Sequence, residues 1–278
     1  MRIRTLADGA ACVALADGRL ARVDHILDDA PSDLLSLLAA GTLDALAAAV
    51  AGGVDDTACV DPQSPIAAPW TRPRKILGIG LNYGAHAGDL GEQAPRTSPA
   101  SFIKGDHTIV GPGEPIIVPP GIGRVTAEAE LGLVIGRTCF RVGVDEAMSY
   151  VAGVVPVLDQ TAEEILLENP RYLTRVKNYP TFFSFGPELI TLDEVLSHGP
   201  LSGLRVATVH NGAVHRTDTV AGMTFSPAEL LSFHSQVMPF YPGDILSTGT
   251  PGAVPIVAGD VVRCELGDTL ASLTNPVR

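Results

Sequence analysis

The sequence predicts a β-rich α+β fold in two parts, a small α+β N-terminal domain over residues 1–68 and a larger domain over residues 69–278. Short apolar runs separated by turns follow one another from Lys75 onward, with few helical stretches between them, and this alternation is typical of a curled mixed sheet or a barrel-like body. The 29 glycines and 22 prolines among the 278 residues supply many turns. Hydrophobic residues, 46% of the chain, provide for an ample core.

The N-terminal part begins with short strands joined by two Ala-Asp-Gly turns. Capping residues predict one helix between Asp33 and Gly41 and a second between Thr42 and Gly52. No cluster of reactive side chains occurs before about Ala68, and a proline-rich stretch, PQSPIAAPWTRP, leads into the rest of the chain. We therefore interpret this part as a small domain without its own catalytic site.

The larger part contains several short runs with the length and composition of strands. The predicted strands are KILGIGL, PIIVPP, ELGLVIG, VVPVL, LRVATVHNG, DILSTGT and DVVRCEL. Helices are predicted near residues 144–152, 161–168 and 226–236, the last with Pro227 and Glu229 in its first turn. This order of elements predicts strands as the scaffold, with short helices between them.

Charge and cysteine content exclude several classes of partner. The formal net charge of −12 argues against non-specific binding of nucleic acid and against adhesion to an anionic membrane. The Ala/Leu stretch over residues 34–50 is interrupted by Gly41 and Asp44, so we expect no membrane span there. The four cysteines form no CxxC motif and no export signal is evident, which predicts reduced, mostly buried thiols in a cytoplasmic protein.

Two glutamates two residues apart are the most informative feature of the chain. Glu128 and Glu130 lie in the apolar run VTAEAELGLVIG, so on a strand both carboxylates point to one face. Asp159 follows at the end of a second apolar run, YVAGVVPVL. Buried together, such acids need a compensating cation, and three hard oxygen ligands suit Mg²⁺ or Mn²⁺. The alternative is a pair of carboxylates that face solvent.

Three further segments carry side chains with possible chemical roles. His86 and Asp89 are three residues apart, so a helical turn would pair them as a base and its orienting carboxylate. Lys177 precedes the aromatic run TFFSFGP and could neutralise an anion, and STGTPG near Thr250 has the character of an anion-binding loop. The alternatives are a surface histidine, a surface lysine with a buried stem, and a plain turn.

The order of these segments resembles the fumarylacetoacetate hydrolase family. The matching blocks run from about Lys75 to Arg278 and are GLNYGAHAGD, Phe102-Ile-Lys104, VGPGEPIIVP, EAELGLVIGR, YVAGVVPVLD, VKNYPTFFSFGP, NGAVHRTDT, MTFSPAEL, PGDILSTGTPG and NPV. The resemblance implies a β-roll-like body of mixed sheets, a homodimer, and a small-molecule 2-oxo acid as substrate.

The resemblance also implies a role for each matching residue. It implies that Glu128, Glu130 and Asp159 bind Mg²⁺ or Mn²⁺, that Lys177 lies beside the metal, and that His86 with Asp89 activates water. The substrate-binding residues expected from the matching blocks and their surroundings are Tyr83, Lys104, Arg171, Arg175, Gly249 and Thr250.

Three departures from the family pattern bear on the substrate. Asp89 stands where glutamate is common, one methylene shorter. Glu163 stands where many members have arginine, which puts ordinary recognition of a substrate carboxylate in doubt unless Arg171 or Arg175 compensates. Pro180 stands where aspartate is frequent. We interpret these changes as the sign of an unusual substrate.

The chemistry expected from these residues is cleavage of a C–C bond in acylpyruvates or related 2,4-dioxo acids. The HxxD pair favours this metal-dependent hydrolase, because a decarboxylase has less use for a base that activates water. The second hypothesis is an oxaloacetate-type decarboxylase or a 2-hydroxy-diene-dioate isomerase on the same scaffold. The third is a metal- or ligand-binding protein without turnover.

Overall fold

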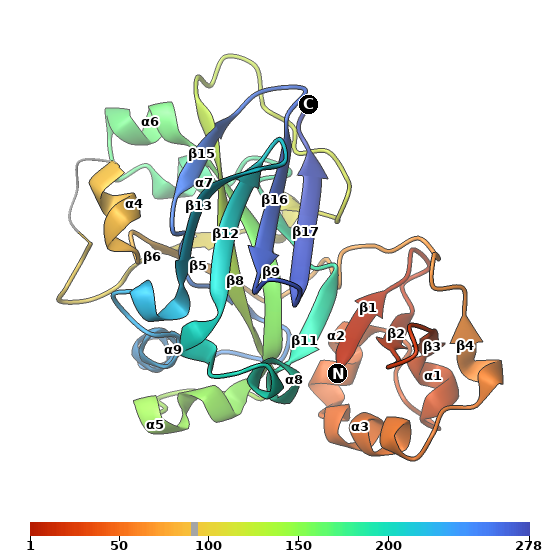
Figure 1. Ribbon diagram of the computed structural model, residues 1–278. Helices are drawn as coiled ribbons and strands as arrows, with labels where there is room; N and C mark the ends of the chain where they lie inside the picture. The colour runs from red at the N-terminus through yellow and green to blue at the C-terminus, as the bar shows by residue number, and fades with distance from the viewer. Residues whose placement is uncertain (90–93) are drawn as a thin grey trace.

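The computed structural model describes residues 1–89 and 94–278, without the side chain of Asp89. A small N-terminal unit of short strands and helices lies beside a larger body in which two sheets pack face to face (Figure 1). Parallel and antiparallel strand pairs occur together in the larger sheet. The prediction of a β-rich α+β fold with mixed sheets is confirmed; the boundary near residue 68 stays a prediction.

The N-terminal unit is built from short elements. They are β1 (Arg2–Thr5), β2 (Ala11–Ala14), β3 (Leu20–Arg22), α1 (Val23–Ile26), α2 (Leu34–Ala40), α3 (Leu43–Ala51), η1 (Asp56–Ala58) and β4 (Cys59–Val60). The carboxylate of Asp33 accepts a hydrogen bond from the Ser36 N–H at 2.9 Å and caps α2, and Gly41 ends it with φ +69°. Both predicted helices are therefore present at the predicted limits.

Helices α2 and α3 meet at an angle of 105°. Within the described residues, no single helix has the length and apolar composition of a membrane span, although this bent pair passes the same test when its two helices are taken together.

The larger sheet joins the two parts of the chain. Counted over the described residues it has 13 strands, and its continuous path runs β4-β3-β2-β1-β11-β9-β8-β14-β5-β6. The strands beyond β4 are β5 (Ile76–Gly80), β6 (Ala100–Lys104), β7 (Ile109–Val110), β8 (Val125–Ile135), β9 (Val151–Ala162), β10 (Phe183–Phe185), β11 (Glu188–Thr191), β14 (Ile245–Ser247) and β15 (Ala253–Ile256). Strand β10 pairs with β7 and β9, and β15 pairs with β8.

The smaller sheet covers one face of β8 and β9. It has the order β13-β12-β16-β17, from β12 (Arg205–His210), β13 (Ala213–Thr219), β16 (Val261–Leu266) and β17 (Ala271–Pro276). Leu131 and Leu158 of the larger sheet and Cys264 of the smaller one are buried in the main core between the sheets. A second core under α2 and α3 includes Val157 and Phe183, so both faces of β9 are buried.

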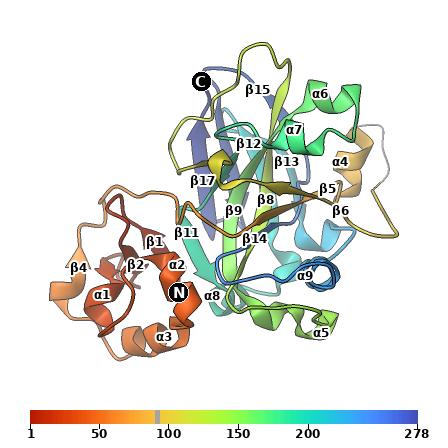
Figure 2. The ribbon, with the colours of Figure 1, turned by 180° about the vertical axis from the view of Figure 1, so that it is seen from behind.

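Short helices connect the strands. They are α4 (Gly84–Asp89), η2 (Asp106–Thr108), α5 (Val144–Ala147), η3 (Met148–Tyr150), α6 (Glu163–Glu168), α7 (Leu173–Lys177), α8 (Leu192–Ser197), η4 (Leu201–Gly203), η5 (Val220–Gly222) and α9 (Pro227–Ser235). Figures 1 and 2 show α4, α6 and α7 together at one end of the body, opposite α5 and α9. The start predicted for the last helix is confirmed, since Ser226 and Glu229 form a capping box.

Three expectations about elements were wrong in detail. The run PIIVPP forms no named strand and contributes an isolated bridge at Ile116, because its prolines lack the N–H groups that a ladder needs. The helix expected over 144–152 ends at Tyr150, and Val151 already begins β9. Asp159, expected at the end of its run, lies inside β9, which continues to Ala162.

Candidate active site

The three predicted acids meet on one face of the β8–β9 ladder. The antiparallel register places Glu128 opposite Asp159, and Glu130 is two residues further along β8 on the same face. One carboxylate oxygen from each residue lies within 4.8 Å of the others, and all three side chains are buried. The alternative of solvent-facing strand carboxylates is therefore wrong.

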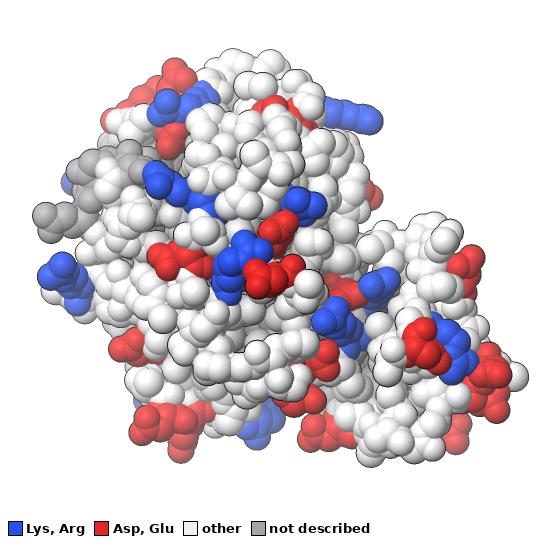
Figure 3. Space-filling view, viewed as in Figure 1, with Lys and Arg blue, Asp and Glu red and all other residues white. Residues whose placement is uncertain are grey.

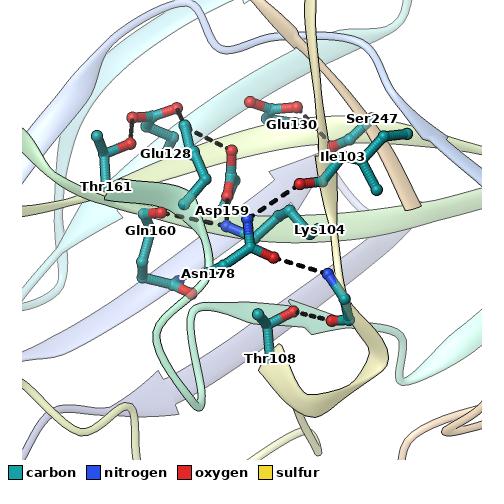
Figure 4. Close-up of polar contacts among 12 residues, drawn as sticks. Ile103, Lys104, Thr108, Glu128, Glu130, Asp159, Gln160, Thr161, Asn178 and Ser247 are labelled. Carbon is teal, nitrogen blue, oxygen red and sulfur yellow. Dashed lines mark hydrogen bonds and ion pairs between the residues drawn. The ribbon is translucent and has the colours of Figure 1, made fainter. Parts of the chain in front are cut away.

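Two buried lysines are paired with this cluster. The ammonium of Lys177 lies 2.9 Å from Glu128 Oε2 and 2.6 Å from Asp159 Oδ2. Lys104, from β6, forms an ion pair with Asp159 Oδ1 and donates to the Gln160 carbonyl at 3.2 Å (Figure 4). Because Lys177 is buried and doubly paired, the alternative of a surface lysine is wrong.

Hydroxyl and backbone N–H donors orient one carboxylate oxygen of each glutamate. Thr161 Oγ1 donates to Glu128 Oε1 at 2.5 Å, and Ser247 Oγ donates to Glu130 Oε2 at 2.5 Å (Figure 4). The Gly249 N–H donates to the same Glu130 oxygen at 2.9 Å. Gly249 has φ +92°, which side chains rarely adopt, so glycine is required for this N–H to face the carboxylate.

Burial and neighbouring charge move the ionisation of these groups in opposite directions. Burial, with the charges of Asp159 and Glu128, raises the pKa of Glu130 to about 8. Burial also works against ionised Glu128, but the charges of Lys177 and His86 outweigh it and leave its pKa lowered. Burial lowers the pKa of Lys104 to about 8. Glu130 is therefore the carboxyl that holds a proton near neutral pH in the absence of a further cation.

The cluster is suited to a divalent cation. Glu130 Oε1 has no hydrogen-bond partner among the described residues although it is buried, which leaves an oxygen available as a ligand. Three carboxylates carry three negative charges when ionised, and the two lysines supply two positive ones, so one negative charge remains. Oxygen donors of this kind are the ligands that Mg²⁺ and Mn²⁺ prefer. The residues present therefore fit the metal that the sequence predicts.

His86 lies at the edge of the cluster, on α4. The ring is buried, and its charge contributes to the lowered pKa of Glu128, so the histidine and the carboxylate are electrostatic neighbours. A surface histidine was the alternative, and it is wrong. The segment around His86 is helical, as the predicted pairing requires, but the side chain of Asp89 lies outside the described residues and the pair itself stays a prediction.

The other expected substrate-binding residues divide into buried and exposed ones. Tyr83 is fully buried next to α4, and burial followed by the charges of Asp218 and Glu130 raises its pKa. Thr250 is also buried, and its hydroxyl exchanges hydrogen bonds of 3.2 Å with the backbone of Gly252. Arg171 and Arg175 are exposed on the α6–α7 segment. Their roles in substrate binding stay predictions.

Sequence reasoning missed Ser247 and Thr161 as partners of the glutamates. Ser247 is 117 residues from Glu130 along the chain, and the antiparallel pairing of β14 with β8 brings them together. Thr161 is two residues beyond Asp159, so the alternation of a strand could have placed its hydroxyl on the same face. Extending the predicted strand past Asp159 would have found it.

Fold and site together define a class: a β-rich protein with a buried Glu-Glu-Asp metal site supported by two lysines. The family model described as "Fumarylacetoacetate (FAA) hydrolase C-terminal" matches residues 75–278. The chain belongs to the fumarylacetoacetate hydrolase family, as its sequence blocks indicate. It is a metal-dependent enzyme of that superfamily.

Relatives of known activity catalyse different reactions. The chain is 34% identical over 218 residues to rat mitochondrial oxaloacetate tautomerase Fahd2a, covering 76% of this chain and 68% of the relative. It is 35% identical over 244 residues to 2,4-didehydro-3-deoxy-L-rhamnonate hydrolase from Sphingomonas sp. (strain SKA58), covering 84% of each. Maleylpyruvate hydrolase from Sphingobium sp. SYK-6, crystallised with Mn(II) and pyruvate, aligns with a TM-score of 0.81 and 26% identity over 100% of this chain and 98% of that chain.

Proposed function

We propose that the protein is a metal-dependent hydrolase that cleaves the C3–C4 bond of acylpyruvates or related 2,4-dioxo acids. The observation that carries the proposal is a buried histidine, His86, beside the carboxylate cluster, where a base for water is needed. Two relatives are hydrolases by name, and one of them was crystallised with manganese and pyruvate.

Glu128, Glu130 and Asp159 would hold Mg²⁺ or Mn²⁺ through their clustered oxygens. When bound, the ion supplies Lewis acidity toward a 2-oxo acid, which offers it a carboxylate and a ketone oxygen. The Lys177 ammonium, already placed against two of these carboxylates, neutralises negative charge that develops on the substrate as the bond to C3 breaks.

His86 begins the proton transfers of the proposed reaction. The imidazole takes a proton from water, and the oxygen of that water adds to the C4 carbonyl carbon. Collapse of the adduct breaks the C3–C4 bond and leaves its electron pair on C3, as the enolate of pyruvate. A proton then adds to C3, and the products are pyruvate and a carboxylic acid. Atoms and charge balance with water as the one co-reactant.

A second candidate is an oxaloacetate-type decarboxylase or an isomerase that moves a proton on the same scaffold. The similarity to an oxaloacetate tautomerase over 76% of the chain favours it. Decarboxylation needs neither an activated water nor a base, so His86 separates a decarboxylase from the hydrolase.

The test is a substrate panel with and without metal. Purified protein is incubated with Mn²⁺ or Mg²⁺ and either acetylpyruvate or oxaloacetate, and the same mixtures with chelator serve as the metal control. Loss of the diketo absorbance with formation of pyruvate supports hydrolysis; carbon dioxide or enol–keto conversion from oxaloacetate, with acetylpyruvate intact, supports the second candidate. Turnover of neither compound, nor of a wider panel of 2-oxo acids, supports a binding protein.

Replacement of His86 tests its assigned role. His86→Ala is expected to lower hydrolysis by about 10²–10⁴-fold while largely sparing decarboxylation of oxaloacetate. His198→Ala is the matched control, because His198 is exposed and pairs with Glu194 away from the cluster. Equal losses on both substrates in His86→Ala would contradict a role in activating water.

We also propose that the protein is a homodimer in the cytoplasm and does not bind nucleic acid or membranes. Its cysteines are free thiols, three of them buried, which is consistent with a reducing compartment. On the face drawn in Figure 3, acidic and basic side chains are interspersed. Light scattering on the purified protein tests the dimer, and fractionation of the source cells tests the location.

A further inference from the structure

The face that carries the carboxylates continues outward along the same two strands. Beyond the Glu128–Asp159 pair, the register places Thr126 opposite Thr161. Just outside the ladder, Arg124, which precedes β8, forms an ion pair with Glu163, the first residue of α6. Because same-face residues on a strand are about 6.6 Å apart, Thr126 lies about that far along β8 from Glu128. We name Thr126, Thr161, Arg124 and Glu163 the outer pairs.

Among the outer pairs, the Thr126 hydroxyl is the group that lacks a hydrogen-bond partner in the described part of the chain. It is buried, and it has no hydrogen-bond partner among the described residues. The opposite hydroxyl, Thr161, already donates its proton to Glu128. Pro255, the partner of Thr126 on β15, is exposed, so the face reaches solvent on that side. A polar group of a ligand that extends outward from the cluster would satisfy Thr126.

The charge of the outer pairs is balanced within the protein. Glu163 is mostly buried and pairs with the Arg124 guanidinium, and Glu164 accepts a hydrogen bond of 3.0 Å from the Arg124 N–H. The guanidinium is therefore already committed to an acid, and a second carboxylate on a substrate would also meet the negative charge of Glu163. This arrangement disfavours a dianionic substrate and tolerates a neutral polar one.

We propose that the outer pairs select 2-oxo acids that carry a hydroxyl group on the part of the chain remote from the 2-oxo end, with Thr126 hydrogen-bonded to that hydroxyl. The selection works against substrates with a second carboxylate through the Arg124–Glu163 pair. The inference rests on the proposed function, since it requires Glu128, Glu130 and Asp159 to hold the 2-oxo end through the metal.

Binding of three matched ligands tests the inference without turnover. The ligands are 2-oxopentanoate, 5-hydroxy-2-oxopentanoate and 2-oxoglutarate, which differ at the remote end as methyl, hydroxyl and carboxylate. Dissociation constants are measured by calorimetry on the full-length protein loaded with Mn²⁺. The hydroxylated ligand is expected to bind about three- to tenfold more tightly than 2-oxopentanoate, the gain of one neutral hydrogen bond, and 2-oxoglutarate is expected to bind most weakly.

Three variants assign the effect to residues. Thr126→Val is expected to bring the ratio of the dissociation constants of 2-oxopentanoate and 5-hydroxy-2-oxopentanoate close to one. Glu163→Gln frees the Arg124 guanidinium and is expected to strengthen binding of 2-oxoglutarate about tenfold relative to binding of the hydroxylated ligand. Glu164→Gln is the matched control and should leave the ratios unchanged, because Glu164 contacts the Arg124 backbone and not its guanidinium.

The outcomes separate this inference from the proposed function. Tightest binding of 2-oxoglutarate by the native protein, or a hydroxyl preference that survives in Thr126→Val, would overturn the inference and leave the hydrolase proposal intact. Failure of all three ligands to bind would overturn both, since the 2-oxo end would then have no site.

Discussion

Replacement of Lys177 by methionine should destabilise the metal-free protein strongly. The change removes one of two buried cations beside the carboxylates and keeps a side chain of similar length. Its ammonium lies within 2.9 Å of Glu128 Oε2 and 2.6 Å of Asp159 Oδ2, with all three groups buried. Breaking a buried pair from one side leaves uncompensated charge and costs about 3–5 kcal/mol. We expect the free energy of unfolding to fall by that amount.

A divalent ion should reverse much of this loss. The ion binds the folded state and adds stability according to its concentration and dissociation constant. Without the Lys177 ammonium, the negative charges of Glu128 and Asp159 lose a compensating partner, and the nearby positive charge that repels the ion is gone. The stability gained on addition of Mn²⁺ should therefore be larger in Lys177→Met than in the native protein.

Urea denaturation with chelator and with Mn²⁺ measures both quantities. Lys75→Met is the matched control, because the Lys75 ammonium lies 2.5 Å from the buried carboxylate of Asp244, away from the cluster. It should lose stability but gain from Mn²⁺ no more than the native protein does. The reasoning is refuted if Lys177→Met is as stable as the native protein without metal, or if Mn²⁺ stabilises all three proteins equally.

Two further predictions concern protonation and packing. The pKa of Glu130 is raised from 4.5 to about 8 on folding, so the stability that its protonation contributes is fully present below about pH 4.5 and is lost as pH rises through 8, while the affinity for Mn²⁺ increases. Unfolding and metal titrations at pH 5, 6.5 and 8 measure these two trends. Glu130→Gln should flatten the pH dependence of both the stability and the Mn²⁺ affinity. Gly153→Ala should cost about 1–3 kcal/mol, because the added methyl would collide with the Ile190 carbonyl. Gly143→Ala, with open space around it, should change stability little in the same urea experiment.

Local sequence patterns were sufficient for the helices of the N-terminal unit and for most strands. Asp33 and Gly41 mark the ends of α2 because capping and left-handed φ are properties of single residues. The pairing of strands distant in sequence is different in kind. Strand β1 joins the larger sheet through β11, close to 190 residues along the chain, and no local pattern encodes that contact.

The acidic part of the site could be predicted because strand periodicity and burial constrain it. Two glutamates two apart in an apolar run must share a face, and they need a cation there. The positions of Lys177 and Lys104 came from resemblance to a family, and their contacts with Asp159 depend on how α7 and β6 pack. The partner of Glu163 could not be predicted at all, since Arg124 precedes an apolar run and carries no motif.

Charge balance explains why this site has two lysines beside three acids. With Glu130 protonated, two carboxylates face two ammonium groups and the metal-free cluster is neutral. A divalent ion that displaced the proton of Glu130 into solvent would give the cluster a total of one positive charge. A 2-oxo acid brings one negative charge and restores neutrality, whereas a second remote carboxylate would have to be balanced elsewhere. Arg124, just before β8, is already paired with Glu163. On the proposal above, Glu163 therefore acts together with the carboxylate cluster to favour a monoanionic substrate.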